Sequence, residues 1–462
     1  MEIRKFDRMM KGKRVAFCGI GGSNLPLIRR FAGMGAAVTA RDRRSPEQLG
    51  QTARELEELG VRLVTGEGYL KDLDEDVIFR TPGMRYYLPE LNEARARGAA
   101  VTSEMEVFFD LCPCKIIGVT GSDGKTTTTT VISGILRAAG KTVHVGGNIG
   151  EPLLPRIGEI GPDDVVVAEL SSFQLISMRR SPDVAVVTNI SPNHLDVHRD
   201  MQEYIGAKKN IVLHQNAFGR AVLNADNDLA ASFSASARGA CMLFSRRHPV
   251  EFGAWTDGNG EIRVACGGTE TRVMSVSDIA VPGAHNIENY LAAVCAVWGD
   301  AGPEAIRSVA GSFQGVEHRN EFVREFEGVR YYNDSIGTTP SRTISGALSL
   351  FDRKILLIAG GYDKNIPFDP LGPAVVEKVK TLVLLGATAE KIENAVKAAP
   401  GYAEGNPEIV RAASLEEAVA ACRAKAEKGD AVVLSPACAS FDMFPNFETR
   451  GERFKELVNG LK

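Results

Sequence analysis

One short run, Gly121-Ser-Asp-Gly-Lys-Thr-Thr127, combines the residue types that bind a polyphosphate. Glycines let the backbone approach phosphate oxygens, and the amides at the start of a following helix point towards them. A lysine neutralises the phosphate charge, and a threonine hydroxyl can ligate magnesium. We therefore expect nucleotide phosphates to contact Gly121, Ser122, Asp123, Gly124, Lys125, Thr126 and Thr127.

The surroundings of this loop support the prediction. It follows an apolar run at 115–120 and precedes a helix expected over 128–139, which is the strand–turn–helix context of a phosphate loop. The spacing is compact, because the usual first glycine position is occupied by Val119. A purely structural turn would account for the glycines but not for the lysine and threonines at a helix start.

Acids and bases after two further apolar runs are candidates for metal chemistry. Glu169 ends the run 165–168, where its carboxylate could hold a metal ion or could simply cap a surface strand. His194 follows the run 184–188 together with Asp196 and His198, at the sheet edge where open α/β folds place ligands. A zinc hydrolase is an alternative, but no third ligand has suitable spacing.

Near the N-terminus, Gly19-Ile-Gly-Gly-Ser-Asn24 with Asp42 further along the chain is similar to a dinucleotide-binding turn. Asn24 stands where the third glycine should be, so the pattern is weak alone. A nicotinamide dehydrogenase built on this segment therefore stays open as an alternative.

The pattern of the elements that must position these residues is typical of an α/β protein built in three blocks. Short β-branched runs alternate with turns and amphipathic stretches, which is typical of parallel sheets with covering helices. The first block holds the runs 14–18 and 37–40, the second 115–120, 165–168 and 184–188, and the third 354–359, 381–385 and 430–435. A polar, glycine-rich stretch at 235–282 suggests an antiparallel insertion.

Composition narrows the functional classes. The 462 residues are 44% hydrophobic and 24% charged, with a net charge of −4, so no strong positive field for nucleic acid is present. No apolar run approaches the roughly 20 residues of a membrane span. We expect a cytoplasmic protein with no nucleic-acid or membrane partner, whose eight cysteines are reduced and structural.

Several motifs, in this order, resemble those of the muramyl ligase family over nearly the whole chain. They are the loop 121–127, Gly147-Asn-Ile-Gly150, Glu169-Leu-Ser-Ser-Phe-Gln174, His285-Asn-Ile-Glu-Asn289, His318-Arg319, Asn333-Asp-Ser335 and Ser435-Pro-Ala-Cys-Ala-Ser440. The resemblance implies three domains. They are a Rossmann-like UDP-substrate domain (1–113), a central P-loop ATP-binding domain (114–315) and a Rossmann-like amino-acid-binding domain (316–462).

The resemblance also implies an activity. An ATP-dependent ligase of peptidoglycan synthesis, acting in cell wall biogenesis and so in cell shape and division, would add D-glutamate to UDP-N-acetylmuramoyl-L-alanine. The substrate carboxylate would take the γ-phosphate of ATP, and the amine would attack the resulting acyl phosphate. A monomer is expected. A related amide ligase with another amino-acid acceptor and a nucleotide-hydrolysing switch remain as alternatives.

By resemblance, Lys125, His194 and Lys208 are the catalytic residues, and two magnesium sites involve Thr126, Glu169, His194 and Lys208. Lys208 matches a lysine that the family carries as a carbamate, which would turn a cation into a carboxylate-like ligand. Read from the sequence alone, Lys208 is one of two solvated helix lysines.

The resemblance assigns the remaining contacts residue by residue. ATP would also meet Asn286, Asn289, Arg319 and Asp334. The uridine nucleotide substrate would meet Ser23, Asp42, Arg43, Thr81, Asn148 and His194. D-Glutamate would meet Thr338, Lys364, Ser440, Phe441 and Phe447. One departure concerns acceptor specificity, because Ile336 stands where the family commonly has a lysine.

Overall fold

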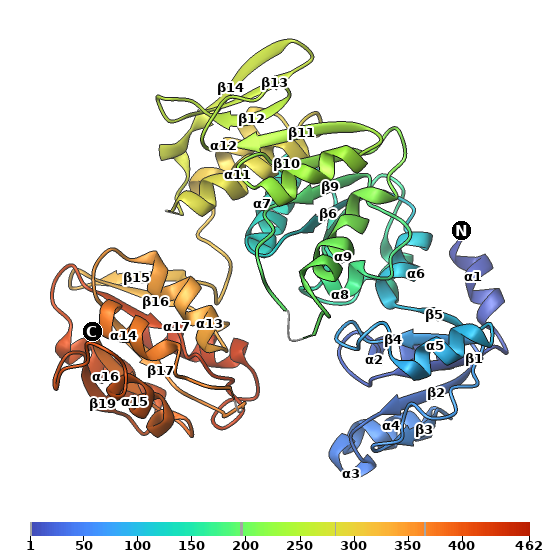
Figure 1. Ribbon diagram of the computed structural model, residues 1–462, viewed down its shortest axis with the longest axis horizontal. Coiled ribbons are helices and arrows are strands. Elements are labelled where there is room, and N and C mark those ends of the chain that lie inside the picture. Colours follow the sequence, from blue (N-terminus) through green and yellow to red (C-terminus); the bar gives the residue numbers. More distant parts are fainter. Residues whose placement is uncertain (1, 195–196, 282, 365) are drawn as a thin grey trace. The chain divides into compact units, whose positions relative to one another are not determined.

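Three β-sheets follow one another along the chain in the computed structural model, which describes residues 2–194, 197–281, 283–364 and 366–462 (Figure 1). Asp196 lies outside the described residues. The chain forms two compact units, Met1–Phe313 and Gln314–Lys462. The first two sheets share the first unit, and the third sheet forms the second. The domain limits 1–113, 114–315 and 316–462 stay a prediction.

The first sheet is parallel and has the strand order β3-β2-β1-β4-β5. The strands after β1 are added first on one side of it, as β2 and β3, and then on the other, as β4 and β5, so the order reverses between β1 and β4. Its strands are β1 (Arg14–Cys18), β2 (Ala37–Asp42), β3 (Arg62–Thr65), β4 (Val77–Arg80) and β5 (Ala100–Thr102). Its helices are α1 (Ile3–Met10), α2 (Leu25–Gly33), α3 (Pro46–Leu49), α4 (Gln51–Glu58), α5 (Pro89–Ala96) and α6 (Glu104–Leu111). Ligands of such sheets bind where the order reverses.

The central sheet has the order β14-β13-β12-β11-β10-β9-β6-β8-β7. Its strands are β6 (Lys115–Thr120), β7 (Val143–Gly147), β8 (Val165–Glu169), β9 (Val184–Val187), β10 (Arg220–Asn224), β11 (Ala240–Ser245), β12 (Gly253–Thr256), β13 (Glu261–Cys266) and β14 (Thr269–Ser275). Its helices are α7 (Lys125–Ala138), η1 (Leu154–Glu159), α8 (Ser172–Leu175), α9 (Met201–Leu213), α10 (Asp228–Ala231), η2 (Ser232–Ser236), η3 (Val276–Asp278), α11 (Ala284–Val297) and α12 (Pro303–Ser312).

Burial explains why the central strands are almost continuously apolar. Ile117 and Val119 of β6 pack with α7, α11 and α12 on one face, whereas Ile116 packs with α6 and η1 on the other. A strand covered on both faces has no solvent side to keep polar. Because β6 pairs parallel with both β8 and β9, the carboxyl ends of the three strands lie at one edge of the sheet.

The antiparallel insertion expected at 235–282 is smaller than the sequence suggested. β11 and β12 run parallel to β10, whereas the next two pairings, β12 with β13 and β13 with β14, are antiparallel, so that β13 runs against the sheet and β14 runs with it. The two strands extend the same sheet at its edge. Alternation of polar residues marked an exposed face, but it does not report strand direction.

The C-terminal unit holds a sheet of order β15-β16-β20-β17-β18-β19, in which only β15 is antiparallel. Its strands are β15 (Glu321–Phe326), β16 (Val329–Asn333), β17 (Ile355–Ala359), β18 (Val379–Leu384), β19 (Glu408–Arg411) and β20 (Ala431–Leu434). Its helices are α13 (Pro340–Thr343), η4 (Ile344–Leu348), α14 (Leu371–Lys378), α15 (Ala389–Lys397), α16 (Leu415–Lys425) and α17 (Phe447–Asn459). α14 and α15 pack on one face, and α16 and α17 on the other.

The predicted α/β class with three successive sheets is thus confirmed. Among the described residues, no helix combines the length and apolar character needed to cross a membrane.

Candidate active site

The loop between β6 and α7 adopts a conformation that requires its two glycines. Gly121 and Gly124 have φ of +154° and +78°. A Cβ on Gly121 would lie 1.8 Å from the Thr188 hydroxyl oxygen, and one on Gly124 would lie 2.3 Å from the Asn289 side-chain oxygen. α7 begins at Lys125, three residues earlier than the sequence suggested, so the phosphate loop runs directly into a helix N-terminus.

The end of β9 holds this loop in place. The amide of Ser122 donates to the Asn189 carbonyl at 2.8 Å, and the amide of Asp123 donates to the Asn189 side chain at 3.0 Å. The Thr188 hydroxyl donates to the Asp123 carbonyl at 2.6 Å. These contacts fix the loop before any phosphate arrives, which lowers the entropy lost on binding.

Two lysines converge on one loop carbonyl. The Nζ of Lys125 donates to the Gly121 carbonyl at 3.1 Å, and the Nζ of Lys208, from α9, donates to the same oxygen at 2.7 Å. Lys208 is only 2% exposed and also donates to the Thr120 hydroxyl at 3.2 Å. Burial, followed by the charge of Lys125, holds the pKa of Lys208 well below its ordinary value. Lys208 is therefore buried against the loop and is not a solvated helix lysine.

Glu169 ends β8, the strand beside β6, and is 1% exposed. One carboxylate oxygen accepts the Thr126 hydroxyl at 2.7 Å, and the other accepts the Asn148 side-chain amide at 2.8 Å. A carboxylate and a hydroxyl at this distance are oxygen ligands that suit a hard divalent cation. The structure thus places Asn148, expected on the uridine nucleotide, against Glu169.

The two histidines after β9 have different environments. His198 is 4% exposed, stacks on Phe173 with ring centroids 5.1 Å apart, and contacts the Ser172 hydroxyl at 2.8 Å. His194 has a left-handed φ of 56°, and its ring lies edge-on to Phe173 at 5.1 Å. His198 is thus held by packing, which leaves His194 as the candidate ligand. Within the described residues, no three-residue metal-ligating cluster includes either histidine.

Asn286 and Asn289 lie on one face of α11, as their spacing predicted. Both are 5% exposed, and the Asn289 amide donates to the Asn286 side-chain oxygen at 3.3 Å. The Asn289 oxygen accepts the Thr128 hydroxyl of α7 at 3.2 Å. The pair therefore stands beside the phosphate loop.

In the first sheet, Asp42 fixes the glycine-rich turn after β1. Its carboxylate accepts the Ile20 amide at 2.7 Å and both the amide and the guanidinium of Arg44 at 2.9 Å. Arg44 is thus a partner of Asp42, whereas Arg43 is exposed. Thr81 faces this turn, because a Cβ on Gly19 would lie 3.0 Å from its methyl carbon. Ser23 is half-buried in the same turn.

Arg80 is a residue that the motif analysis did not single out. It ends β4, is 1% exposed, and donates to the Phe173 carbonyl at 2.7 Å and the Ser177 hydroxyl at 2.9 Å. It thereby joins the loop that carries Thr81 to the segment that carries Phe173. The only sequence signal was an arginine closing an apolar strand.

In the C-terminal unit, Asp334 follows β16 and is 3% exposed. Its carboxylate accepts the Ser435 hydroxyl at 2.6 Å and the Asn320 amide at 3.3 Å. Burial raises the pKa of Asp334 to about 6, against the opposing charge of Arg319. The two residues expected on ATP from this unit are therefore electrostatically linked.

Thr338 and Lys364, both expected on D-glutamate, contact each other. The Nζ of Lys364 donates to the Thr338 carbonyl and hydroxyl, each at 3.2 Å, and burial lowers the pKa of Lys364. Phe441 is 65% exposed and packs on Tyr362.

The other two residues expected on D-glutamate have their own surroundings. Ser440 is 2% exposed, and Phe447 begins α17, where its carbonyl accepts the Ser335 hydroxyl at 2.7 Å. Ile336, which stands where the family commonly has a lysine, donates its backbone amide to the His318 carbonyl at 3.1 Å.

Arg450 is a second residue missed by the motif analysis. It is 1% exposed, and its guanidinium donates to the Ser335 hydroxyl at 3.0 Å, the Cys438 carbonyl at 3.2 Å and the Ala439 carbonyl at 3.2 Å. Burial lowers the pKa of Arg450 to about 10. It ties the segment after β16 to the segment after β20, which carries Ser440.

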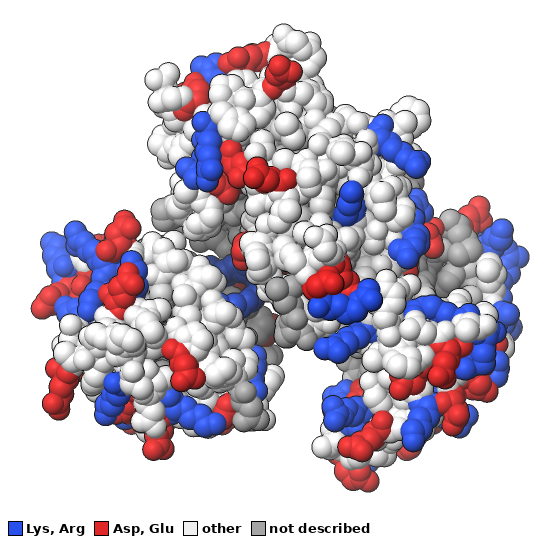
Figure 2. All heavy atoms as spheres, in the orientation of Figure 1, with Lys and Arg blue, Asp and Glu red and all other residues white. Residues whose placement is uncertain are grey.

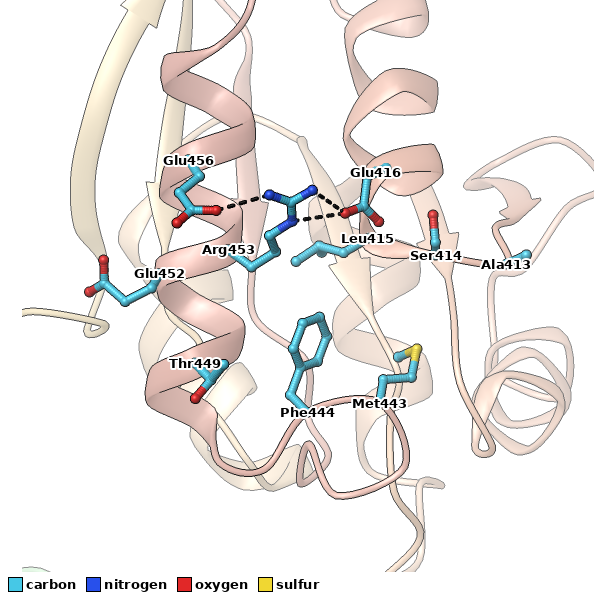
Figure 3. Close-up of a pocket in the computed structure, with 10 residues that line it drawn as sticks. All are labelled: Ala413, Ser414, Leu415, Glu416, Met443, Phe444, Thr449, Glu452, Arg453 and Glu456. Atoms are coloured by element: carbon cyan, nitrogen blue, oxygen red, sulfur yellow. Dashed lines mark hydrogen bonds and ion pairs between the residues drawn. The ribbon is translucent and has the colours of Figure 1, made fainter.

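A shallow pocket in this unit contains none of the candidate site residues. Figure 3 shows it between α16 and α17, where Arg453 pairs with Glu416 and Glu456. In Figure 2, basic and acidic side chains are interspersed over the visible surface, which matches the small net charge of −4.

Comparisons with known proteins bear on both units. Residues 119–297 match the Mur ligase middle domain, and residues 318–438 match the Mur ligase glutamate ligase domain. UDP-N-acetylmuramoylalanine--D-glutamate ligase of Acetivibrio thermocellus is 51% identical over 100% of this chain and 99% of its own. The enzyme of the same name from Clostridium kluyveri strain NBRC 12016 is 50% identical over 99% of this chain and 98% of its own.

Among solved structures, UDP-N-acetylmuramate-alanine ligase from Thermotoga maritima is similar in fold. Its TM-score is 0.57 at 18% identity, over 97% of this chain and 100% of that one.

Proposed function

The chain belongs to the Mur ligase family, and from that premise we infer that it joins D-glutamate to UDP-N-acetylmuramoyl-L-alanine in an ATP-dependent step of peptidoglycan synthesis. The observation that carries this function is full-length identity near 50% to ligases of that name, combined with the phosphate loop of residues 121–127.

The phosphates of ATP would lie against the loop, where backbone amides at the start of α7 are directed and Gly121 and Gly124 leave no side chain in the way. Lys125 now folds back on two loop carbonyls, the nearer at 3.0 Å, and would exchange them for phosphate oxygens. The lysine then stabilises charge on the phosphoryl group as it moves.

Thr126 and Glu169 would hold one magnesium ion, because their oxygens already lie 2.7 Å apart. His194 and Lys208 are the proposed ligands of a second. Magnesium would neutralise phosphate charge and orient the γ-phosphate for attack. Asn148, on the other oxygen of Glu169, would hold the carboxylate in the ligating orientation.

Lys208 is proposed to act as a carbamate. Only a neutral amine adds to carbon dioxide, and the burial that lowers the pKa of Lys208 increases the neutral fraction near pH 7. The product is an anion in place of a cation, which also relieves the repulsion from Lys125. Its carboxylate-like oxygens would then be free to ligate a cation.

The reaction would proceed by attack of the muramoyl-alanine carboxylate on the γ-phosphorus, with ADP leaving and an acyl phosphate forming. The D-glutamate amine then attacks the acyl carbon and phosphate leaves. The Nζ of Lys364, which lies on Thr338, is the cation proposed to hold a carboxylate of D-glutamate. Ser440, Phe441 and Phe447 are proposed as its further contacts.

The remaining assignments are proposals of the same kind. The turn shaped by Asp42, together with Ser23, Arg43 and Thr81, would receive the uridine nucleotide at the switch point of the first sheet. Arg319 and Asp334 are proposed as ATP contacts. We propose that the protein acts as a monomer in the cytoplasm.

A panel assay tests the function. Phosphate release from ATP is measured with UDP-N-acetylmuramoyl-L-alanine and each of several amino acids, including L-glutamate, D-aspartate and D-glutamate. D-Glutamate should stimulate release and yield the coupled amide, and Lys125→Ala should abolish both. Stimulation by a different amino acid would reassign the acceptor, and release without any acceptor would indicate a nucleotide-hydrolysing switch.

A further inference from the structure

Two cysteines that the ligase reaction does not use lie next to each other in the segment joining α6 to β6. Cys112 and Cys114 flank Pro113, and their sulfur atoms are 3.7 Å apart. Both thiols are free, and both residues are half-buried, so small reagents can reach them. Pro113 between them is exposed.

The backbone on both sides holds the two sulfurs close. Cys112 directly follows α6, donates its amide to the Phe108 carbonyl at 2.8 Å and has the extended ψ of 123° that a following proline favours. Cys114 precedes Lys115, the first residue of β6, whose Nζ pairs with Asp300 at 2.6 Å. Residues two apart have Cα atoms within roughly 7 Å, which overlaps the roughly 4.4–6.8 Å span of a disulfide.

The local chemistry makes the two thiols unequal. The hydrogen bond between the two thiols is the main cause that lowers the pKa of Cys112, and the nearby charge of Arg180 acts in the same direction. The same hydrogen bond and burial raise the pKa of Cys114. Cys112 is therefore the better nucleophile and Cys114 the resolving thiol, which is the division of roles in a dithiol exchange.

The other six cysteines lack this arrangement. Cys18, Cys295, Cys422 and Cys438 are buried, and burial raises the pKa of each. Cys241 and Cys266 are half-buried single thiols. Across the described ranges of the chain, the sulfur–sulfur contact of Cys112 with Cys114 is the one hydrogen-bond-range contact between cysteines.

We propose that Cys112 and Cys114 form a reversible dithiol–disulfide site that exchanges with small-molecule disulfides. The Cys112 thiolate attacks one sulfur of the small disulfide and displaces the first small thiolate, giving a mixed disulfide. Cys114 then loses its proton to solvent and attacks the Cys112 sulfur, displacing the second. Two protein thiols become one disulfide, and one small disulfide becomes two small thiols.

Closing this bond would constrain the segment that joins α6 to β6 in the first unit. It would tie the last turn of α6 to the residue that precedes β6, the strand that leads into the phosphate loop. The site is independent of the proposed ligase activity, since none of the residues assigned to ATP or either substrate takes part. The disulfide would join residues two apart in the sequence and would be partly exposed, and reductants readily reach a disulfide of this kind.

Tryptic mapping of the intact protein tests the proposal. Cleavage after Arg97 and Lys115 isolates both cysteines in one peptide with no other cysteine. The protein is equilibrated with graded ratios of reduced and oxidised glutathione, quenched in acid and alkylated. The peptide should become lighter by two hydrogens and resist alkylation as the oxidised fraction rises, and dithiothreitol should restore both alkylation sites.

Single variants test the assigned roles. Cys114→Ser should accumulate a stable glutathione adduct on Cys112, because the variant lacks the thiol that would resolve it. Cys241→Ser is the matched control on a half-buried single thiol and should leave oxidation of the peptide unchanged. Circular dichroism checks that each variant is folded.

Two outcomes would overturn the proposal. In one, the folded wild-type protein keeps both cysteines alkylatable at every glutathione ratio. In the other, the wild type accumulates only glutathione adducts and no intramolecular disulfide, which would mean that the sulfurs cannot close. Failure of Cys114→Ser to hold a glutathione adduct on Cys112 would refute the assignment of Cys112 as the attacking thiol.

Discussion

Lys208 shows how much one buried side chain can contribute to a site. Its Nζ lies 2.7 Å from the Gly121 carbonyl oxygen, in a position 2% exposed to solvent. Both desolvation and the nearby charge of Lys125 disfavour a full positive charge on this side chain. Conversion to the proposed carbamate would replace the repulsion from Lys125 with an attraction.

We expect Lys208→Ala to lower amide formation by at least about 100-fold, as loss of a metal-ligating or charge-stabilising group does. A small carboxylate such as acetate should restore part of the activity, because it can replace the missing carbamate oxygens. Steady-state phosphate release with all three substrates measures both effects. Lys209→Ala, on the adjacent half-buried lysine, is the control and should stay near wild type. Full activity of Lys208→Ala would refute the carbamate role.

At the scale of elements, contacts between α6, α8 and the first two sheets make one unit of them. Glu104 begins α6, is 5% exposed, and accepts the Leu154 amide of η1 at 2.7 Å. Arg80 carries out a similar role from β4. Both are buried ionisable groups whose partners lie on the central sheet side.

Burial raises the pKa of Glu104 from 4.5 to about 7. Since the folded state binds this proton more tightly than the unfolded state, the stabilisation is complete below pH 4.5 and is lost as pH rises through about 7. The loss is roughly 3 kcal/mol at 1.36 kcal/mol per pH unit. The free energy of unfolding is measured in urea between pH 4.5 and 8. Over this range it should fall by about this amount more in wild type than in Glu104→Gln. Glu93→Gln, on the exposed face of α5, is the control. Parallel pH profiles for Glu104→Gln and wild type would contradict the linkage.

Arg80→Lys should lower the free energy of unfolding by about 2–4 kcal/mol, because one ammonium cannot reach both the Phe173 carbonyl and the Ser177 hydroxyl from the fork that a guanidinium offers. Chemical denaturation monitored by fluorescence or circular dichroism measures this change. Arg62→Lys, at the exposed start of β3, should behave as wild type. An unchanged midpoint for Arg80→Lys would mean that the clamp is not stabilising.

At the scale of the whole molecule, the two compact units divide at Phe313 and Gln314. The second unit has its own core on both faces of its sheet, with Leu357 on one side and Leu356 on the other. In the first unit, by contrast, one core includes Phe108 of α6 together with Ile157 of η1. The first two sheets are therefore not separated by a solvent-filled boundary.

A fragment of residues 314–462 should fold alone and unfold cooperatively in urea, because its sheet and both helix layers are contained within it. A fragment of 114–313 should be less stable than one of 1–313, since cutting after 113 exposes the shared core. Circular dichroism with urea titration compares the three. A non-cooperative 314–462, or equal stability of the two longer fragments, would contradict this division.

The phosphate loop and the strands around it could be predicted because their signals are local. Glycines at 121 and 124, a lysine and threonine at a helix start, and β-branched runs of strand length report the backbone within a few residues. The same reasoning placed β6, β8 and β9 and the shared face of Asn286 and Asn289. It also anticipated α/β sheets in three successive blocks, which the structure confirms.

Contacts between residues far apart in the chain were decided only by the tertiary structure. The strand order places β8 beside β6, and so puts Glu169 on Thr126 and Asn148 on Glu169. It likewise puts the Asp42 carboxylate on the Ile20 amide and buries Lys208. Local patterns encode which residues form a strand or turn, whereas the neighbour that each side chain meets depends on how the strands are ordered and packed.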